Sequence, residues 1–183
     1  MYGYVKVGSA VPKLRVADCV YNKEEILKLV EAAAAKQVRV LSFPELSVTG
    51  YTCADLFFQT PLLHAAEQAI QEIAEATEAL NIFLLIGAPI AVDNQMFNCA
   101  VALYKGKLLG IVPKTHIPNY SEFYEERWFA SADDLLTEEI TYAGQNVPIG
   151  ADLIFAAADF PALKIGVEIC EDLWVPIPPS SYL

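Results

Sequence analysis

Positively charged side chains are scarce in this sequence. Its 183 residues contain 12 Lys and Arg against 23 Asp and Glu, which gives a formal net charge of −11. Nucleic acids and anionic membrane surfaces are negatively charged themselves and would be repelled by such a protein. The charge balance therefore argues against both as partners, although it does not indicate which small molecule could bind.

Long apolar runs, closely spaced cysteines and glycine-rich phosphate loops are missing as well. No run approaches the roughly 20 apolar residues that a membrane-spanning helix needs, and the N-terminal residues lack the apolar stretch of a secretory signal. The four cysteines, Cys19, Cys53, Cys99 and Cys170, are too far apart in the sequence to suggest a CxxC pair or a zinc knuckle. We therefore expect a cytoplasmic protein with reduced thiols, no metal site and no membrane association.

Apolar residues, in contrast, are abundant enough for one globular domain. They make up 55% of the sequence against 19% charged residues, which is typical of a folded rather than a disordered chain. Asn22, followed three residues later by Glu25, predicts a capping box at the start of a first helix. Thr60 and Pro61 predict the start of a second helix, whose apolar spacing continues to Leu80.

Short apolar and β-branched runs indicate the strands. The strand candidates are residues 4–10, 38–43, 82–90, 97–104, 107–112, 152–160 and 163–170. Lys105 and Gly106 are short enough as a link to form a hairpin turn. Residues 113–135 have weak periodicity and are expected to form a long functional loop. This order of elements predicts a layered α/β domain with helices on one face of a mixed sheet.

Three reactive side chains, far apart in the sequence, each follow an apolar run. Glu45 follows LSFP, Lys114 follows LLGIVP and Cys170 follows KIGVEI. Residues that leave strands at the edge of an α/β sheet stand where ligands bind. A carboxylate, an ammonium and a thiol supply a general base, a stabiliser of an oxyanion and a nucleophile. The set indicates thiol chemistry at a carbon–nitrogen bond.

Each member of this trio also has a purely structural interpretation. Cys170 could be a buried, inert thiol, Lys114 could extend to solvent, and Glu45 could cap the turn that follows it. Three carboxylates close to Cys170 in the sequence, at positions 168, 171 and 172, should raise the pKa of its thiol. A reactive Cys170 therefore requires a cation from elsewhere, for which Lys114 is the candidate.

The other thiols and the two histidines are weaker candidates. Cys99 lies within a strand candidate and is expected in the core, and Cys53 lies in a loop without an evident activator. His64 is expected on the surface of the second helix. A dyad of Cys170 with His116 remains an alternative.

Three segments, FPELSVTGY, VPKTHIPNYSEFYEERWF and GVEICEDLW, carry a resemblance that covers the whole chain. In order and spacing they resemble the three sequence blocks of the nitrilase superfamily, whose members share a Glu–Lys–Cys triad. YTCADLFFQ and NYSEFYEERWF resemble, in particular, the glutaminase domain of glutamine-dependent NAD synthetases. The resemblance implies an α/β fold of the nitrilase type, an α-β-β-α sandwich that is incomplete at the C-terminus. Residues 1–183 would be the N-terminal part of a glutamine amidohydrolase domain.

The resemblance also implies roles for the matching residues. Glu45 would be the general base and acid, Lys114 the stabiliser of the transition state, and Cys170 the nucleophile that forms a thioester with glutamine. Glu125 matches a supporting carboxylate, for which Glu122 is the alternative. The positions that match the lining of a glutamine pocket are Tyr51, Tyr120, Phe123 and Glu171.

The implied partners lie partly outside these residues. L-Glutamine would be the substrate, and its ammonia would pass to a synthetase domain, absent here, that uses ATP, Mg²⁺ and deamido-NAD. We expect no cofactor within the chain itself, and homo-oligomers as in the family. Two alternatives remain open: a stand-alone nitrilase-type hydrolase for another amide, nitrile or carbamoyl compound, and a catalytically inert fragment. We expect little or no glutaminase turnover from the 183 residues alone.

Overall fold

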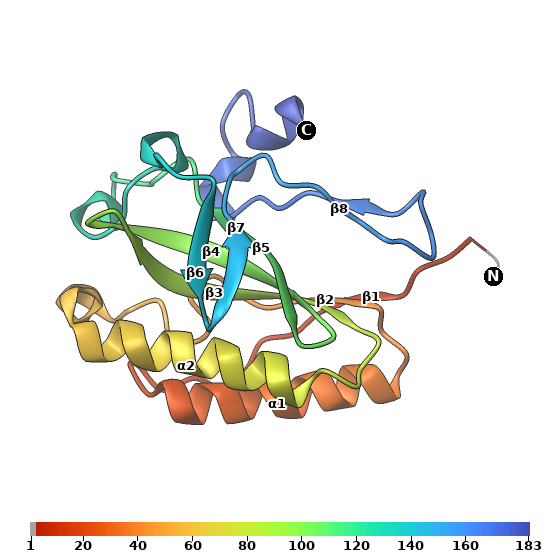
Figure 1. The fold of residues 1–183 in the computed structure, drawn as a ribbon. Coiled ribbons are helices and arrows are strands. Elements are labelled where there is room, and N and C mark those ends of the chain that lie inside the picture. Colours follow the sequence, from red (N-terminus) through yellow and green to blue (C-terminus); the bar gives the residue numbers. More distant parts are fainter. Residues whose placement is uncertain (1–2) are drawn as a thin grey trace.

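A five-stranded mixed sheet forms the centre of the computed structural model, which describes residues 3–183 (Figure 1). Its strands, in spatial and sequence order, are β1 (Val7–Ser9), β2 (Val40–Ser42), β3 (Phe83–Val92), β4 (Gln95–Tyr104) and β5 (Lys107–Pro113). β1, β2 and β3 run parallel, whereas β4 and β5 are antiparallel to their neighbours. The predicted mixed sheet is confirmed, and the first two strands are shorter than predicted.

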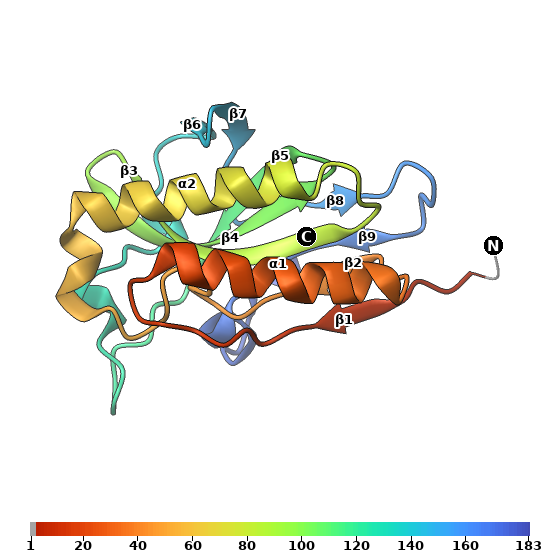
Figure 2. The same ribbon diagram turned by 90° about the horizontal axis from the view of Figure 1, so that it is seen from below.

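Two helices lie side by side on one face of this sheet, as predicted (Figure 2). They are α1 (Cys19–Ala35) and α2 (Thr60–Ala76). Ile26 of α1 and Ile70 of α2 belong to the same buried cluster as Ile86 of β3 and Val101 of β4. Burial of these apolar side chains between the helices and the sheet supplies most of the driving force for this fold.

The first helix begins earlier than its capping pattern predicts. Asp18 is the N-cap, and its carboxylate accepts a backbone N–H in the first turn. Asn22 lies inside the helix, fully buried, and its amide donates hydrogen bonds to the carbonyl oxygens of Arg15 and Val48. The prediction of Asn22 as the cap is wrong, because this side chain joins two loops in the tertiary structure. The predicted start of the second helix at Thr60 is confirmed.

Two tight turns set the register of the antiparallel strands. Residues 93–94 connect β3 to β4, residues 105–106 connect β4 to β5, and all four have positive φ, as type I′ hairpin turns require. The predicted hairpin at residues 105–106 is therefore confirmed. In the resulting register Asn98 of β4 lies beside Lys114, whose backbone N–H donates to the Asn98 carbonyl at 2.8 Å.

The region after β5 agrees least with the sequence-based predictions. A hairpin of β6 (Glu139–Tyr142) and β7 (Gln145–Pro148) was not predicted. β8 (Phe155–Ala156) and β9 (Lys164–Ile165) pair only with each other among the described residues. The long strands predicted at 152–160 and 163–170 are wrong, because most of those residues find no partner strand in the sheet.

The remaining loops contain short 3₁₀ turns. They are Ala54–Phe58, Glu125–Arg127, Ala132–Asp134, Cys170–Leu173 and Pro179–Tyr182. The predicted long loop over residues 113–135 is confirmed, with two of these turns in it. Over residues 3–183 neither helix is long and apolar enough to cross a membrane.

Candidate active site

Glu45 is placed by a close approach of two backbone segments. The chain leaves β2 and crosses β3 at Gly87, where the backbone N–H of Val48 donates to the Gly87 carbonyl at 3.1 Å. A Cβ atom on Gly87 would lie 2.3 Å from the backbone nitrogen of Leu46 and 2.6 Å from the Pro44 carbonyl oxygen. Only glycine permits this contact, and the contact holds the Glu45 segment over the sheet.

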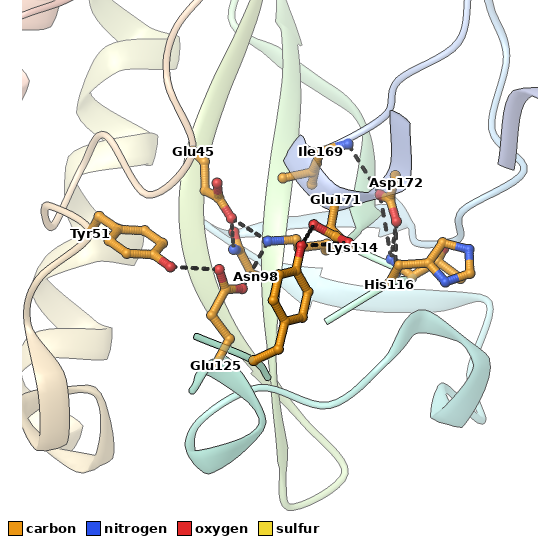
Figure 3. A network of polar contacts seen from close by, with 11 residues as sticks. Glu45, Tyr51, Asn98, Lys114, His116, Glu125, Ile169, Glu171 and Asp172 are labelled. Atoms are coloured by element: carbon orange, nitrogen blue, oxygen red, sulfur yellow. Dashed lines mark hydrogen bonds and ion pairs between the residues drawn. The ribbon is translucent and has the colours of Figure 1, made fainter. Parts of the chain in front are cut away.

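Lys114 follows the last residue of β5 and is completely buried. Its ammonium contacts Glu45 Oε1 at 2.7 Å and Glu125 Oε2 at 2.8 Å (Figure 3). Burial alone would lower the pKa of Lys114, but the two carboxylates outweigh that effect and raise it. The ammonium is therefore retained at neutral pH, and the interpretation of Lys114 as a side chain that extends to solvent is wrong.

Glu125 completes the charged cluster and is 1% exposed, although it lies in a loop. The hydroxyl group of Tyr51 donates a hydrogen bond to Glu125 Oε1 at 2.7 Å (Figure 3). Burial and this bond raise the pKa of Tyr51, so its proton stays in place. Glu122, the alternative supporting carboxylate, is exposed. The structure thus brings Glu45, Lys114 and Glu125 together, with Tyr51 behind them.

Asn98 joins this cluster and was not predicted from the sequence. Its side-chain amide donates to the same Glu45 oxygen that Lys114 contacts, Oε1. Both donors thus bind one oxygen, and the other, Oε2, receives no hydrogen bond from the described residues. A signal existed in the sequence, because Asn98 interrupts the apolar run FNCAVALY and a buried amide requires polar partners.

Cys170 begins a 3₁₀ turn and has a φ of 50°. This left-handed conformation is uncommon for a residue with a side chain and is often found at functional sites. The thiol is exposed, and Cys170 and Glu45 line the same hollow of about 340 Å³. The prediction that Cys170 ends a long strand is wrong, and so is its interpretation as a buried thiol.

The electrostatic surroundings of Cys170 keep its thiol protonated. Although Cys170 is exposed as a residue, partial desolvation of its thiol in the hollow raises the thiol pKa. The charge of Glu45 adds to this increase, Lys114 opposes it, and Glu125 also raises the pKa. The expected rise is present, but its charged causes come from distant segments and not from the neighbouring carboxylates. Because two carboxylates face the single ammonium of Lys114, a base must remove the thiol proton as the sulfur attacks.

Two of the proposed substrate-pocket residues are joined directly. Tyr120 OH donates to the carboxylate of Glu171, the residue after Cys170, at 2.9 Å from Oε2 on an exposed surface. Figure 3 shows where Glu171 lies. This bond raises the pKa of Tyr120. The half-buried ring of Phe123 packs edge-on against Tyr120, with 6.0 Å between ring centroids. Tyr51 lies apart from Glu171, with its hydroxyl group on Glu125 (Figure 3).

The weaker candidates lie elsewhere or lack activating contacts. His64 is exposed on α2, Cys99 is buried in β4, and Cys53 is buried with its thiol donating to the carbonyl oxygen of Thr49. His116 contributes its backbone N–H to Asp172. Between residues 3 and 183 no hydrogen bond joins the His116 ring to Cys170, so the geometry does not support a dyad.

A free thiol on a strained turn, next to a carboxylate that a buried ammonium and an amide hold in place, defines a class of site. Such a site can transfer an acyl group from nitrogen to sulfur and then to water. The chain belongs to the carbon–nitrogen hydrolase family, whose model matches residues 6–178. The resemblance to the nitrilase superfamily is therefore confirmed.

Similar proteins of known sequence and structure agree with this assignment. The chain is 38% identical over 179 residues to the glutamine-dependent NAD(+) synthetase of Mycobacterium leprae, covering 98% of this chain and 26% of that protein. The corresponding protein of Aquifex aeolicus is 30% identical over 88% of this chain and 24% of its own length. The chain thus spans about a quarter of the length of these relatives.

Solved structures show the same fold. A glutamine-dependent NAD(+) synthetase from Cytophaga hutchinsonii superposes with a TM-score of 0.82 and 30% identity, covering 91% of this chain and 28% of that one. An amidase from Nesterenkonia sp. AN1, 16% identical, shares the fold with a TM-score of 0.66 over 92% of this chain and 59% of its own. The expected fold of the nitrilase type is confirmed.

Proposed function

We propose that this chain is the glutamine-hydrolysing part of a glutamine-dependent NAD synthetase. The observation that carries the proposal is the Glu45–Lys114–Glu125 cluster, which lies beside the exposed Cys170 thiol and within hydrogen-bond reach of Tyr51. The similarity to NAD synthetases over nearly the whole chain supports glutamine as the amide.

The first half of the reaction forms a thioester. Glu45 accepts the thiol proton through Oε2, the oxygen to which no group within residues 3–183 donates, while Cys170 Sγ bonds to the side-chain amide carbon of glutamine. Lys114 is the buried cation that balances the negative charge that develops on the carbonyl oxygen of glutamine within the active site. The carbon–nitrogen bond then breaks, Glu45 returns the proton to nitrogen, and ammonia leaves.

The second half of the reaction hydrolyses the thioester. Glu45 takes a proton from water, and the resulting oxygen nucleophile attacks the thioester carbon. The carbon–sulfur bond breaks, the thiolate recovers its proton from Glu45, and glutamate is released. Glu125, with the hydroxyl group of Tyr51 on its other oxygen, keeps Lys114 charged and in place during both steps.

Recognition of the amino acid is assigned to the exposed pair beside the nucleophile. Glu171 has the charge to bind the α-ammonium group of glutamine, and Tyr120 OH orients its carboxylate. Phe123 supports the Tyr120 ring, and Tyr51 forms another part of the pocket wall. A role in substrate binding explains why Glu171 directly follows the nucleophile, although its negative charge would be expected to raise the pKa of the Cys170 thiol.

The remaining partners in NAD synthesis would lie outside these residues. Ammonia would be used by a synthetase domain that binds ATP, Mg²⁺ and deamido-NAD, and the whole protein would form homo-oligomers in the cytoplasm. No residue of this chain is assigned to those cofactors.

The test compares two nitrogen sources in the intact protein that carries these residues. Cys170→Ala should abolish NAD formation driven by glutamine and retain formation driven by ammonium chloride. Cys19→Ala, which removes a buried thiol away from the site, serves as the control and should retain both. Glutamine-driven synthesis that survives in Cys170→Ala would overturn the proposal.

A further inference from the structure

The segment that carries Cys170 is weakly attached to the central sheet. In the described part of the chain, residues 166–183 form no backbone–backbone hydrogen bond with the five-stranded sheet, and β9 just before them pairs only with β8. Val167 and Ile169 pack against Ala100 and Val112 on the sheet face opposite the helices. Apolar packing is not directional. It therefore does not by itself fix the distance of the Cys170 turn from the sheet or the orientation of that turn.

One side chain supplies the missing directional contacts. Asp172, two residues after the nucleophile, is 2% exposed. Its Oδ1 accepts the backbone N–H groups of His116 at 2.7 Å and Thr115 at 3.1 Å, and its Oδ2 accepts that of Ile169 at 3.1 Å (Figure 3). The carboxylate thus joins the residue before Cys170 to the two residues after Lys114.

Among residues 3–183, one other side-chain contact, between Tyr120 and Glu171, links this segment to earlier residues by hydrogen bonds, and it contributes less. Tyr120 and Glu171 meet on an exposed surface, where such contacts contribute little. Bonds from backbone N–H groups to a buried carboxylate are short, charge-assisted and directional. Asp172 is therefore the principal polar link between the nucleophile and the cation within residues 3–183.

We propose that Asp172 is a positioning residue that holds Cys170 over the Glu45–Lys114–Glu125 cluster. It touches neither substrate nor reacting atoms. It anchors the thiol segment to the backbone that immediately follows Lys114, so that sulfur, base and cation keep one relative geometry. The inference deepens the proposed function and rests on it only for the choice of glutamine as the assay substrate.

Asp172→Asn is the sharpest variant, because the shape is kept while one acceptor is lost. The amide oxygen can still accept from Thr115 and His116, but its NH₂ group then faces the N–H of Ile169. Asp134→Asn, an exposed residue of a nearby 3₁₀ turn, makes the same change of charge and is the matched control.

Two measurements on the intact protein separate positioning from folding. The first is glutamine hydrolysis, for which kcat should fall about 100-fold in Asp172→Asn, with KM within about 3-fold, since small displacements of reacting groups have effects of this size. The second is alkylation by iodoacetamide across pH, followed by mass spectrometry of each cysteine. Once displaced from Glu45 and Glu125, the thiol should titrate closer to the ordinary cysteine value of about 8.5, so Cys170 should react faster at pH 8 while hydrolysis is slower.

The three buried cysteines report on folding in the same experiment. Cys19, Cys53 and Cys99 should stay unmodified in Asp172→Asn, as in the wild type. Hydrolysis and alkylation both within about 3-fold of wild type would overturn the inference, and so would adducts on the buried cysteines, which would indicate general unfolding. Because alkylation needs no substrate, a wild type that fails to hydrolyse glutamine would refute the proposed function and leave this inference to be decided by the thiol titration.

Discussion

The charged cluster and the nucleophile segment are attached to the molecule in different ways. Lys114 directly follows strand β5, and the backbone around Glu45 contacts β3 closely at Gly87. Cys170 lies on a turn without backbone hydrogen bonds to that sheet among the described residues. The difference indicates that the electrostatic part of the site is built into the rigid core, and the nucleophile is brought to it by side-chain contacts.

Loss of the buried ammonium should have the largest effect. Lys114→Met leaves Glu45 and Glu125 without their cation, so the free energy of unfolding should fall by about 3–5 kcal/mol and turnover should be lost. Lys107→Met is the control, because Lys107 is an exposed residue at the start of β5, the strand that Lys114 follows. It should change neither stability nor turnover. Denaturant unfolding measures the effect, and a loss under about 1 kcal/mol would mean that the cluster does not belong to the rigid core.

Gly87→Ala should be the next largest, because it acts on the contact that holds Glu45. The new Cβ would lie 2.3 Å from the backbone nitrogen of Leu46, and relief of that clash costs about 1–3 kcal/mol of stability. Turnover should fall about 100-fold as Glu45 moves. Gly8→Ala is the matched control, since the atoms nearest to its Cβ would be side-chain atoms of Leu41 and Val38, at ordinary distances of 3.4 and 3.6 Å. Equal activity in the two variants would contradict this account of the Glu45 segment.

The pH dependence of Cys170 reactivity tests whether the two regions meet. The raised pKa of the thiol means that alkylation at pH 8 should be slower than for a free cysteine and should still increase above pH 9. Glu125→Gln removes one of the charges that raise this pKa, so the pKa should fall and the rate at pH 8 should rise. Glu126→Gln, an exposed neighbour, should leave the rate unchanged. Equal alkylation rates in the two variants would show that the charges of the cluster do not influence the pKa of Cys170.

Tyr51→Phe should have the smallest effect. It removes one hydrogen bond to Glu125 and leaves the ion pair with Lys114, so stability should fall by about 1 kcal/mol and turnover by several-fold. Tyr124→Phe removes a hydroxyl group from an exposed ring next to Glu125 in the sequence and should change neither stability nor turnover. Steady-state kinetics on both variants would show whether Tyr51 acts through Glu125 or through substrate binding, because only the second role raises KM alone.

Local patterns predicted a large part of the sheet and helices. Pro61 after Thr60 marked the start of α2, and Lys105-Gly106 marked the hairpin between β4 and β5, because both signals act over two or three residues. The strands predicted at 152–160 and 163–170 failed because strand formation requires a partner, and a strand sequence carries no information on whether its partner is in place.

The site shows the same division. The chemical types and the order of Glu45, Lys114 and Cys170 were readable, since a charged or nucleophilic residue directly after an apolar run is unusual. When each residue was considered alone, its structural interpretation was favoured over the catalytic one. The contributions of Asn98 and Asp172 were not recognised, because both depend on contacts across more than 50 residues of sequence.

The amino-acid sequence by itself determined which reactive groups this protein has, the hydrophobic patterns of its sheet, and its membership of a family. Only the tertiary structure decided that one ammonium faces two carboxylates, that Lys114 and Asn98 share one oxygen of Glu45, and that Cys170 is exposed on a turn held by Asp172. The physical reason is that charge pairing and desolvation depend on distances between segments far apart in the chain, which no local pattern encodes.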